Sequence, residues 1–392
     1  MIQPADRLSL VQEYYFSRKL KEVAQLNAEG KDIISLAIGS PDMPPSEQTI
    51  NKLCEVAHQP NAHGYQPTQG TPELREAMAR YYKKTYGIDV DPATEVLPLI
   101  GSKEGILHIT LAFVNPGDTV LVPNPGYPTY TSLSKLLGAK VEYYDLKEEH
   151  GWIPYFNDLF HRDLSHVKLM WTNYPHMPTG TPASQGVYDR LVELARENDF
   201  LIVNDNPYSR ILDNSPLSIF STRLTSRENA WNYCLELNSL SKSHNMPGWR
   251  VGMCVGKAEY IKNILKVQSN IESGTFRGLQ LAAADALDYN TDEWHEEYNI
   301  NVYKRRRHLA EQIMDVLGCT YNPYQVGMFL WGKIPESIKN VEDLTERVLH
   351  EARVFITPGF IFGSNGERYI RISLCAKEEK IQAALERIKK AI

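Results

Sequence analysis

From Val96 onward, the chain alternates short apolar runs with segments of helical periodicity. The runs at 96–100, 118–122, 167–171 and 200–203 each have the length and apolar content of a buried strand. Because helical segments separate them, the pattern predicts a parallel sheet with crossover helices. Ligands bind at the carboxyl ends of the strands in such sheets, so the polar residues that follow each run are the first candidates for a functional site.

Other apolar and periodic segments complete the predicted elements. The runs 231–237 and 251–255 indicate two more buried strands, separated by a polar turn, and 33–38 indicates a short strand that ends before Gly39. Periodicity and boundary residues predict helices over 11–29, 72–86, 102–113, 258–287 and 293–317.

Composition and charge narrow the class of protein. With 392 residues, 42% of them hydrophobic and 23% charged, the chain is typical of a globular protein with room for two cores. The net charge of −6 argues against a nucleic acid or an anionic membrane as partner, because either would require a basic face. The five cysteines are scattered and lack metal-ligand spacing, which indicates reduced thiols. Without a signal region or a run of roughly 20 apolar residues, we expect a cytoplasmic protein with no metal and no membrane anchor.

The polar stretch between the runs 231–237 and 251–255 carries the most specific chemistry. Lys242 is flanked by hydroxyls, and Arg250 follows eight residues later. An amine can condense with a carbonyl, while hydroxyls and a guanidinium can hold a phosphate dianion. A lysine beside serines is by itself usually a solvated loop lysine, so this interpretation depends on the rest of the chain. The hydroxyl residues are Ser239, Ser241 and Ser243.

Further polar or glycine-containing motifs follow the other predicted strands. A helix start can bind an anion through its free N–H groups and its positive end. Alone, each motif also has an ordinary explanation, because most helix starts bind nothing and an aspartate at a strand end usually caps a helix. The residues are Gly101, Ser102 and Lys103 after 96–100, Tyr127 after 118–122, Asn173 after 167–171, and Asp205 and Tyr208 after 200–203.

The segment SLSKSHNMPGWRVG resembles the cofactor-lysine segment of the fold-type-I aminotransferases of class I/II, which depend on pyridoxal 5′-phosphate (PLP), and further matches run from about Ile34 to Leu374. The resemblance implies that Lys242 forms a Schiff base with PLP and that Ser239 and Arg250 bind its phosphate. It also implies an α/β fold with a large, doubly wound, mostly parallel sheet domain and a smaller α+β domain formed by both chain ends.

The domain boundaries expected from this resemblance follow the predicted elements. Residues 1–44 form an N-terminal arm and part of the small domain, 45–285 form the large PLP-binding domain, and 286–392 form the small C-terminal domain. The helix predicted over 258–287 is expected to bridge the two domains.

The other motifs match the family position by position. The turn 101–103 resembles the phosphate cup, to which its lysine contributes a backbone N–H. The ring of Tyr127 would stack on the pyridine ring of PLP. Asp205 would pair with the pyridinium nitrogen and keep it protonated, so that the ring accepts electrons. Tyr208 matches the tyrosine that donates to the phenolate oxygen of PLP.

Three more matches concern the substrate and a partner subunit. In the Gly-x-Pro-Asp turn that begins at Gly39, the family glycine lies beside the substrate carboxylate. Arg371, within Ile-Arg-Ile, matches the arginine that binds the α-carboxylate with both ends of its guanidinium. Tyr65, in Tyr-x-Pro-x-x-Gly, matches a tyrosine that crosses to the neighbouring subunit's phosphate, which implies a homodimer with composite sites.

One departure from the family pattern affects the cofactor ring. The segment NYPHMPTG resembles Asn-x-Pro-x-Asn-Pro-Thr-Gly, but Met177 replaces the second asparagine, whose amide donates to the phenolate oxygen. A thioether cannot donate. Asn173, which is the first asparagine of the motif and a cofactor-binding candidate, or His176 could replace this donor, or Tyr208 acts as the only donor.

The resemblance implies a ping-pong aminotransferase that moves the amino group of an L-amino acid to a 2-oxo acid, with 2-oxoglutarate as the expected acceptor. A carbon–sulfur β-lyase or another PLP enzyme on the same fold would share every cofactor residue. A non-catalytic binding protein is the alternative of another class, and the presence of both Lys242 and Arg371 argues against it. For the donor we expect a neutral, aromatic or apolar amino acid, with candidate contacts at Tyr14, Tyr15, Tyr324, Phe329 and Trp331.

Overall fold

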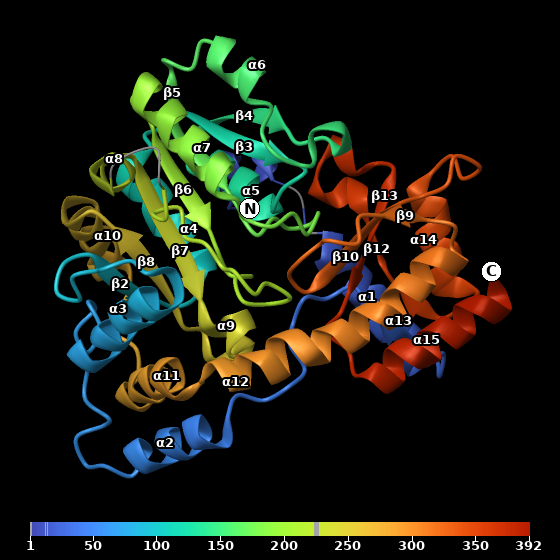
Figure 1. Ribbon diagram of the computed structural model, residues 1–392, viewed down its shortest axis with the longest axis horizontal. Coiled ribbons are helices and arrows are strands. Elements are labelled where there is room, and N and C mark those ends of the chain that lie inside the picture. The colour runs from blue at the N-terminus through green and yellow to red at the C-terminus, as the bar shows by residue number, and fades with distance from the viewer. Residues whose placement is uncertain (1, 12, 14, 223–226) are drawn as a thin grey trace.

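The computed structural model describes residues 2–11, 13, 15–222 and 227–392, so Tyr14 lies outside the described residues. Figure 1 shows two parts, a larger one around a seven-stranded sheet and a smaller one around a four-stranded sheet. One long helical segment runs from the larger part to the smaller part. The α/β architecture predicted from the alternating pattern is therefore confirmed.

The seven-stranded sheet has the order β2-β8-β7-β6-β5-β3-β4. Strands β7, β6, β5, β3 and β4 pair in parallel, whereas β8 is antiparallel to both of its neighbours, β7 and β2. The sheet is thus mostly parallel, as predicted. The strands are β2 (Val96–Leu99), β3 (Thr119–Asn124), β4 (Lys140–Asp145), β5 (Val167–Thr172), β6 (Leu201–Asp205), β7 (Cys234–Ser239) and β8 (Gly252–Gly256).

Helices cover both faces of this sheet. On one face, apolar residues of α4 (Ser102–Phe113), α5 (Pro128–Leu136) and α10 (Ala258–Ile271) pack with strand residues in one core. On the other face, α3 (Pro72–Tyr86) and α7 (Gln185–Asn198) contribute to the main core. Both faces of the central strands are buried, which explains why their sequences are continuous apolar runs.

The run 231–237 was predicted as one strand, and this is partly wrong. Its first residues belong to helix α8 (Arg227–Tyr233), and β7 begins at Cys234. Trp231 is buried against Phe220, and its Nε1 donates to Glu95 at 2.8 Å. A short apolar run does not distinguish the end of a buried helix from the start of a buried strand.

The helix predicted over 258–287 is two helices, α10 and α11 (Arg277–Tyr289), and neither bridges the two parts. Helix α11 packs against α2 (Glu47–Ala57) and α3 on the larger part. The connection in Figure 1 is instead α12 (Asp292–His295), the π-helical segment η4 (Glu296–Asn301) and α13 (Val302–Val316). Helix α13 packs on α15 and β10 of the smaller part.

Both ends of the sequence contribute elements to the smaller part, although the N-terminal segment η1 (Asp6–Leu10) contacts α5 of the larger part. Its antiparallel sheet has the order β12-β13-β10-β9, and β1 pairs in parallel with β11. The strand predicted over 33–38 is only the two residues of β1. The elements are α1 (Tyr15–Ala28), β1 (Ile34–Ser35), β9 (Thr320–Tyr321), β10 (Phe329–Lys333), α14 (Val341–His350), β11 (Val354–Phe355), β12 (Thr357–Pro358), β13 (Tyr369–Ser373) and α15 (Glu378–Ala391).

Short helices fill the connections between these elements. They are η1 (Asp6–Leu10), η2 (Glu148–His150), α6 (Phe156–His161), α9 (Leu240–Ser243), η3 (Pro247–Trp249), η5 (Gly359–Phe362) and η6 (Ser364–Gly366). None of the helices in the described ranges combines the length and the apolar character needed to cross a bilayer.

Candidate active site

A cavity of about 450 Å³ lies where the carboxyl ends of the large-sheet strands meet the smaller part. Most of the residues predicted from the strand-end motifs line it, together with residues from both chain ends. Those predicted residues are Gly39, Ser102, Lys103, Tyr127, Asn173, Asp205, Tyr208, Ser239, Lys242, Arg250 and Arg371.

Lys242 is held on the one-turn helix α9, where a polar turn had been predicted. The Ser239 side chain caps this helix by accepting from the N–H of Ser241 at 3.1 Å. The Lys242 Nζ donates to the carbonyl oxygen of Gly39. Burial lowers the pKa of the Lys242 amine, and the positive charges of Arg250 and Arg371 add to this effect. A larger fraction of the amine is therefore neutral and nucleophilic at neutral pH.

The start of α4 forms a cradle for an anion. Gly101 precedes the helix with a φ of +80° and has no side chain to cap the N–H groups of the first turn, and the next two residues, Ser102 and Lys103, line the cavity. A Cβ on Gly101 would lie 2.2 Å from Nη2 of Arg250. The Arg250 guanidinium donates through Nη1 to the Ser241 hydroxyl at 3.3 Å. The positive end of helix α4, the Arg250 guanidinium and the nearby serine hydroxyls thus lie close together. This is the combination of groups that binds a phosphate.

Asp205 ends β6 and is buried. Its Oδ2 accepts from the Tyr130 hydroxyl at 2.8 Å, whereas Oδ1 has no hydrogen-bond partner among the described residues. Burial raises the pKa of the Asp205 carboxyl to about 7. Sequence reasoning missed Tyr130, although it lies only three residues after the predicted Tyr127, in the stretch PGYPTY. The Tyr130 ring stacks on Trp171 at 5.0 Å between centroids.

Asn173 holds the backbone at the end of β6 and the turn that follows β5. Its Nδ2 donates to the Asp205 carbonyl oxygen, and its Oδ1 accepts from the Met177 N–H at 2.8 Å. The His176 ring is buried outside the cavity, where its Nδ1 lies 2.8 Å from the Thr179 hydroxyl oxygen. Tyr208 does line the cavity, and burial raises the pKa of its hydroxyl, which therefore stays protonated and able to donate.

Arg371 on β13 is fixed between a carbonyl, a thioether and aromatic rings. Its Nη2 donates to the Ala37 carbonyl oxygen at 2.8 Å, and its Nη1 lies 3.3 Å from the Met177 sulfur. The guanidinium carbon lies 3.9 Å from the centroid of the Phe329 ring and 4.7 Å from that of Phe362. Met177, which stands where the family has asparagine, is therefore a direct neighbour of this arginine.

A second polar cluster lies behind α9. Asn299, in η4, donates through its side-chain Nδ2 to the Ser243 carbonyl oxygen at 2.8 Å, and the backbone carbonyl of Asn299 accepts from the Leu212 N–H at 3.0 Å. Both Asn299 and Ser243 are buried. Asn299 thus supports the helix that carries Lys242. Sequence reasoning missed it, because nothing in the local pattern of 293–317 distinguishes a π-helical turn.

Several predicted residues do not line this cavity. Tyr65 is 94% exposed, and Tyr324 is 80% exposed. Tyr15 packs on Phe360, with 5.7 Å between ring centroids, and Trp331 stacks on Tyr369 at 5.0 Å. Phe329 does line the cavity, and so does Phe16, which follows Tyr14 and Tyr15 in the predicted N-terminal helix. The sequence had not singled out the other apolar residues that line it, which are Leu20, Ala37, Ile38 and Phe362.

Comparisons with known proteins agree with this arrangement. A model of the family described as aminotransferase class I and II matches residues 31–388. An LL-diaminopimelate aminotransferase of Dehalococcoides mccartyi strain 195 is 37% identical over 97% of each chain, and one from Halothermothrix orenii is 38% identical over 99% of this chain and 98% of its own. Substrate-bound BacF from Bacillus subtilis aligns with a TM-score of 0.91 at 34% identity, covering 100% of this chain and 98% of its own. A mutant of Thermus thermophilus aspartate aminotransferase aligns with a TM-score of 0.90 at 26% identity over 100% of both chains.

Proposed function

The chain belongs to the aminotransferase class I and II family and is a transaminase that moves an amino group from an amino acid to a 2-oxo acid, and from that premise we propose that it works with PLP bound at Lys242 and with 2-oxoglutarate as acceptor. The observation that carries the proposal is that one cavity collects a half-buried amine, a carboxylate oxygen that has no hydrogen-bond partner among the described residues, and an anion cradle. These groups correspond to the aldehyde, the ring nitrogen and the phosphate of PLP.

The residues present fit this cofactor. The oxygen Oδ1 of Asp205 has no described hydrogen-bond partner and would accept from a protonated ring nitrogen. The cradle of Gly101, Ser102, Lys103 and Arg250 would hold the phosphate through backbone N–H groups and the guanidinium. The ring of Tyr127 lines the same cavity and would contact the face of the heterocycle.

The reaction assigns a task to each residue. Bound PLP supplies a carbonyl that condenses with amines and a ring that takes up the electrons of the broken Cα–H bond. The Lys242 amine would hold the cofactor at rest and, when free, would serve as the general base that removes the proton from Cα and as the acid that returns a proton. The Asp205 carboxylate would keep a proton on the ring nitrogen, and the Tyr208 hydroxyl would donate to the ring oxygen. Arg371 binds the α-carboxylate and so fixes the orientation of the Cα–H bond, with Gly39 beside it.

For the donor we propose an L-amino acid with an apolar or aromatic side chain. The cavity is also lined by five large apolar side chains, those of Phe16, Leu20, Ile38, Phe329 and Phe362. Asp205 is the one acidic residue among the described residues that line the cavity, and its task is at the ring nitrogen. LL-diaminopimelate, which the names of similar enzymes favour, carries a second ammonium and carboxylate and is the alternative donor.

We also propose a homodimer. The side chain of Tyr65 is almost fully exposed, although the sequence motif around it matches the family's contact to a neighbouring phosphate. A partner subunit would bury this ring and add groups to the open side of the cavity. Such groups could bind the distal charges of a long substrate, which is why the donor must be tested on the assembled enzyme.

The test of the proposed function is a donor panel with the PLP-loaded enzyme. L-Phenylalanine, L-leucine and LL-diaminopimelate are each added without acceptor, and the visible absorbance and the 2-oxo acid formed are followed. We expect a stoichiometric 2-oxo acid from an apolar or aromatic donor, and 2-oxoglutarate then restores the starting spectrum. If LL-diaminopimelate is the only one of the three that is converted, the proposed apolar or aromatic donor is wrong and LL-diaminopimelate is the donor. Catalytic release of ammonia and pyruvate from a β-substituted substrate such as L-cystathionine would show a β-lyase instead.

Replacing Gly101 with alanine should weaken PLP binding about 10- to 100-fold. The φ of +80° strains an alanine by roughly 1–3 kcal/mol, and the new Cβ would displace the Arg250 guanidinium. Equilibrium titration of the cofactor measures the effect. Gly87→Ala is the matched control, because Gly87 has a φ of +72° but no atom within 4 Å of an added Cβ. Equal affinities in the two variants would contradict the phosphate cradle.

A further inference from the structure

The chain segment 36–42, which carries Gly39, forms one wall of the cavity through its backbone carbonyls. The Ala37 oxygen accepts from Arg371 Nη2 at 2.8 Å and from the Thr357 hydroxyl at 3.4 Å. The Gly39 oxygen accepts from the Lys242 Nζ. The two groups that act on substrate in the proposed function therefore both contact this segment.

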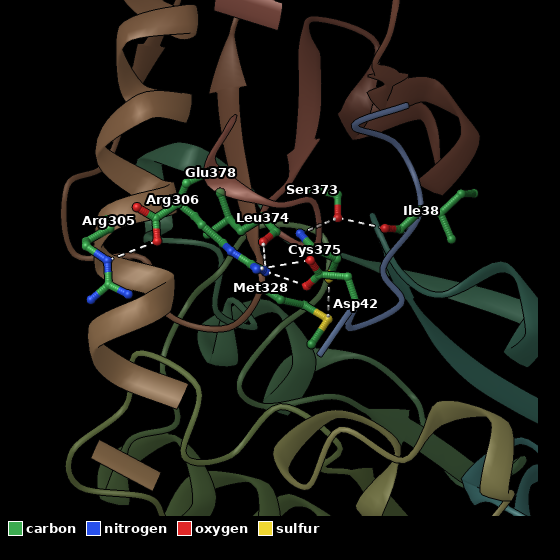
Figure 2. Close-up of polar contacts among 9 residues, drawn as sticks. All are labelled: Ile38, Asp42, Arg305, Arg306, Met328, Ser373, Leu374, Cys375 and Glu378. Carbon is green, nitrogen blue, oxygen red and sulfur yellow. Dashed lines mark hydrogen bonds and ion pairs between the residues drawn. The ribbon is translucent and has the colours of Figure 1, made fainter. Parts of the chain in front are cut away.

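The near end of the segment is tied to the end of β13. The Leu36 oxygen accepts from the Ser373 N–H at 2.8 Å, and the Ile38 oxygen accepts from the Ser373 hydroxyl at 2.7 Å. The same hydroxyl oxygen accepts from the Cys375 N–H at 3.2 Å. Figure 2 shows this connection between Ile38, Ser373 and Cys375.

The far end is tied to α13 by an ion pair. Both guanidinium ends of Arg306 donate to the Asp42 carboxylate, at 2.7 Å and 3.1 Å, and Nη1 also donates to the Leu374 carbonyl oxygen at 3.2 Å. The two side chains are 5% and 22% exposed. In Figure 2 Arg306 reaches from its helix toward Asp42, whereas Arg305 on the same helix contacts Glu378 instead. A bidentate pair with this burial fixes geometry as well as charge.

We propose that Arg306 is a positioning residue for substrate binding, which acts through Asp42 to hold the segment 36–42 where the Ala37 carbonyl orients Arg371. This inference rests on the proposed function, since Arg371 is the proposed carboxylate ligand. Ser373 and Arg306 restrain the segment on either side of Gly39. Without the ion pair, the restraint at Asp42 is lost, and the carbonyl that holds Nη2 of Arg371 is free to shift. Amino acid and 2-oxo acid both present an α-carboxylate, so both should bind less tightly.

The test compares Arg306→Met and Asp42→Asn with Arg305→Met in the PLP-loaded enzyme. Arg305→Met is the matched control, because Arg305 lies on the same helix but its ion pair with Glu378 is at the surface, where the two side chains are 51% and 37% exposed. We expect both Arg306→Met and Asp42→Asn to raise KM for donor and acceptor by about tenfold, equivalent to about 1.4 kcal/mol. The dissociation constant of PLP should stay unchanged, because the phosphate cradle lies elsewhere. Assays are run well below the unfolding temperature of each variant.

Two further measurements separate positioning from a general loss of stability. The double variant Asp42→Asn/Arg306→Met should raise KM no more than either single variant, since both remove the same contact. Arg306→Lys should raise KM less than Arg306→Met does, because lysine keeps the positive charge but cannot bind the carboxylate with two nitrogens. If Arg306→Met lowers the unfolding temperature and leaves both KM values at those of Arg305→Met, Arg306 is only structural and the inference is wrong. Failure of the proposed function itself would be seen separately, as an unmodified enzyme that does not transaminate.

Discussion

Lys242→Ala is expected to lower kcat for amino-group transfer by about 10⁴-fold or more. The variant loses the amine that attaches the cofactor and the base that moves the proton from Cα, and general acid–base catalysis alone contributes about 10²- to 10⁴-fold. The fold should persist, because the substitution removes the Nζ hydrogen bond to the Gly39 carbonyl but leaves the Ser239 cap of α9 in place.

Borohydride reduction followed by peptide mass analysis checks this expectation directly. In the unmodified enzyme, reduction should fix the cofactor to the peptide that contains residue 242, and Lys242→Ala should carry no label. Lys242→Arg keeps a positive charge without the reactive amine and should behave like the alanine variant. Lys257→Ala removes a lysine near Glu259 at the protein surface and should label normally. A cofactor fixed at another lysine would overturn the assignment.

Asp205→Asn is expected to produce the second-largest effect, a fall in kcat of about 10²- to 10⁴-fold. A neutral amide does not keep a proton on the ring nitrogen, so the ring takes up electrons less readily. The phosphate cradle is untouched, and the cofactor should still attach to Lys242. Single-turnover rates with a saturating donor measure the chemical step, and a rate within threefold of the unmodified enzyme would contradict the proposed role.

The same substitution should change how the stability of the cofactor-free protein depends on pH. Burial raises the pKa of Asp205 from 3.8 to about 7, so between these values the folded chain keeps a proton that the unfolded chain releases. The contribution of this carboxyl to the free energy of unfolding therefore falls as pH rises from about 4 to about 7. Urea unfolding at pH 5 and pH 8 should show Asp205→Asn gaining stability relative to the unmodified chain at the higher pH. No relative change would contradict the raised pKa.

Most of the fold and of the candidate site could be predicted because short stretches of neighbouring residues determine them. Each strand end carries its functional residue directly after an apolar run, and a parallel sheet brings those ends to one edge. Thr71, Pro72 and Gly87 likewise marked α3 correctly, because capping depends only on neighbouring residues. The strand-end positions together with the resemblance to the family therefore pointed to Lys242 and Asp205, and both residues line one cavity.

What the sequence did not reveal depends on contacts between distant segments. The pairing of Asp42 with Arg306 joins residues 264 positions apart, and no local pattern distinguishes Arg306 from Arg305 beside it. The hydrogen bond from the Tyr130 hydroxyl to Asp205 likewise joins residues 75 positions apart. The helical character of 231–233 was hidden because a buried helix end and a buried strand are equally apolar.

The π-helical turn η4 sets the angle around the helix axis between two contacts of the connecting helical segment. Each α-helical residue advances the chain by about 100° around the axis, and a π-helical turn accommodates one residue more than an α-turn. Asn299, within η4, faces the Ser243 carbonyl, and Arg306, after it, faces Asp42. Deleting one residue from 296–301 would straighten the helix but rotate one of these two contacts away from its target. Insertions and deletions in this stretch should thus be far less tolerated than substitutions on its exposed side.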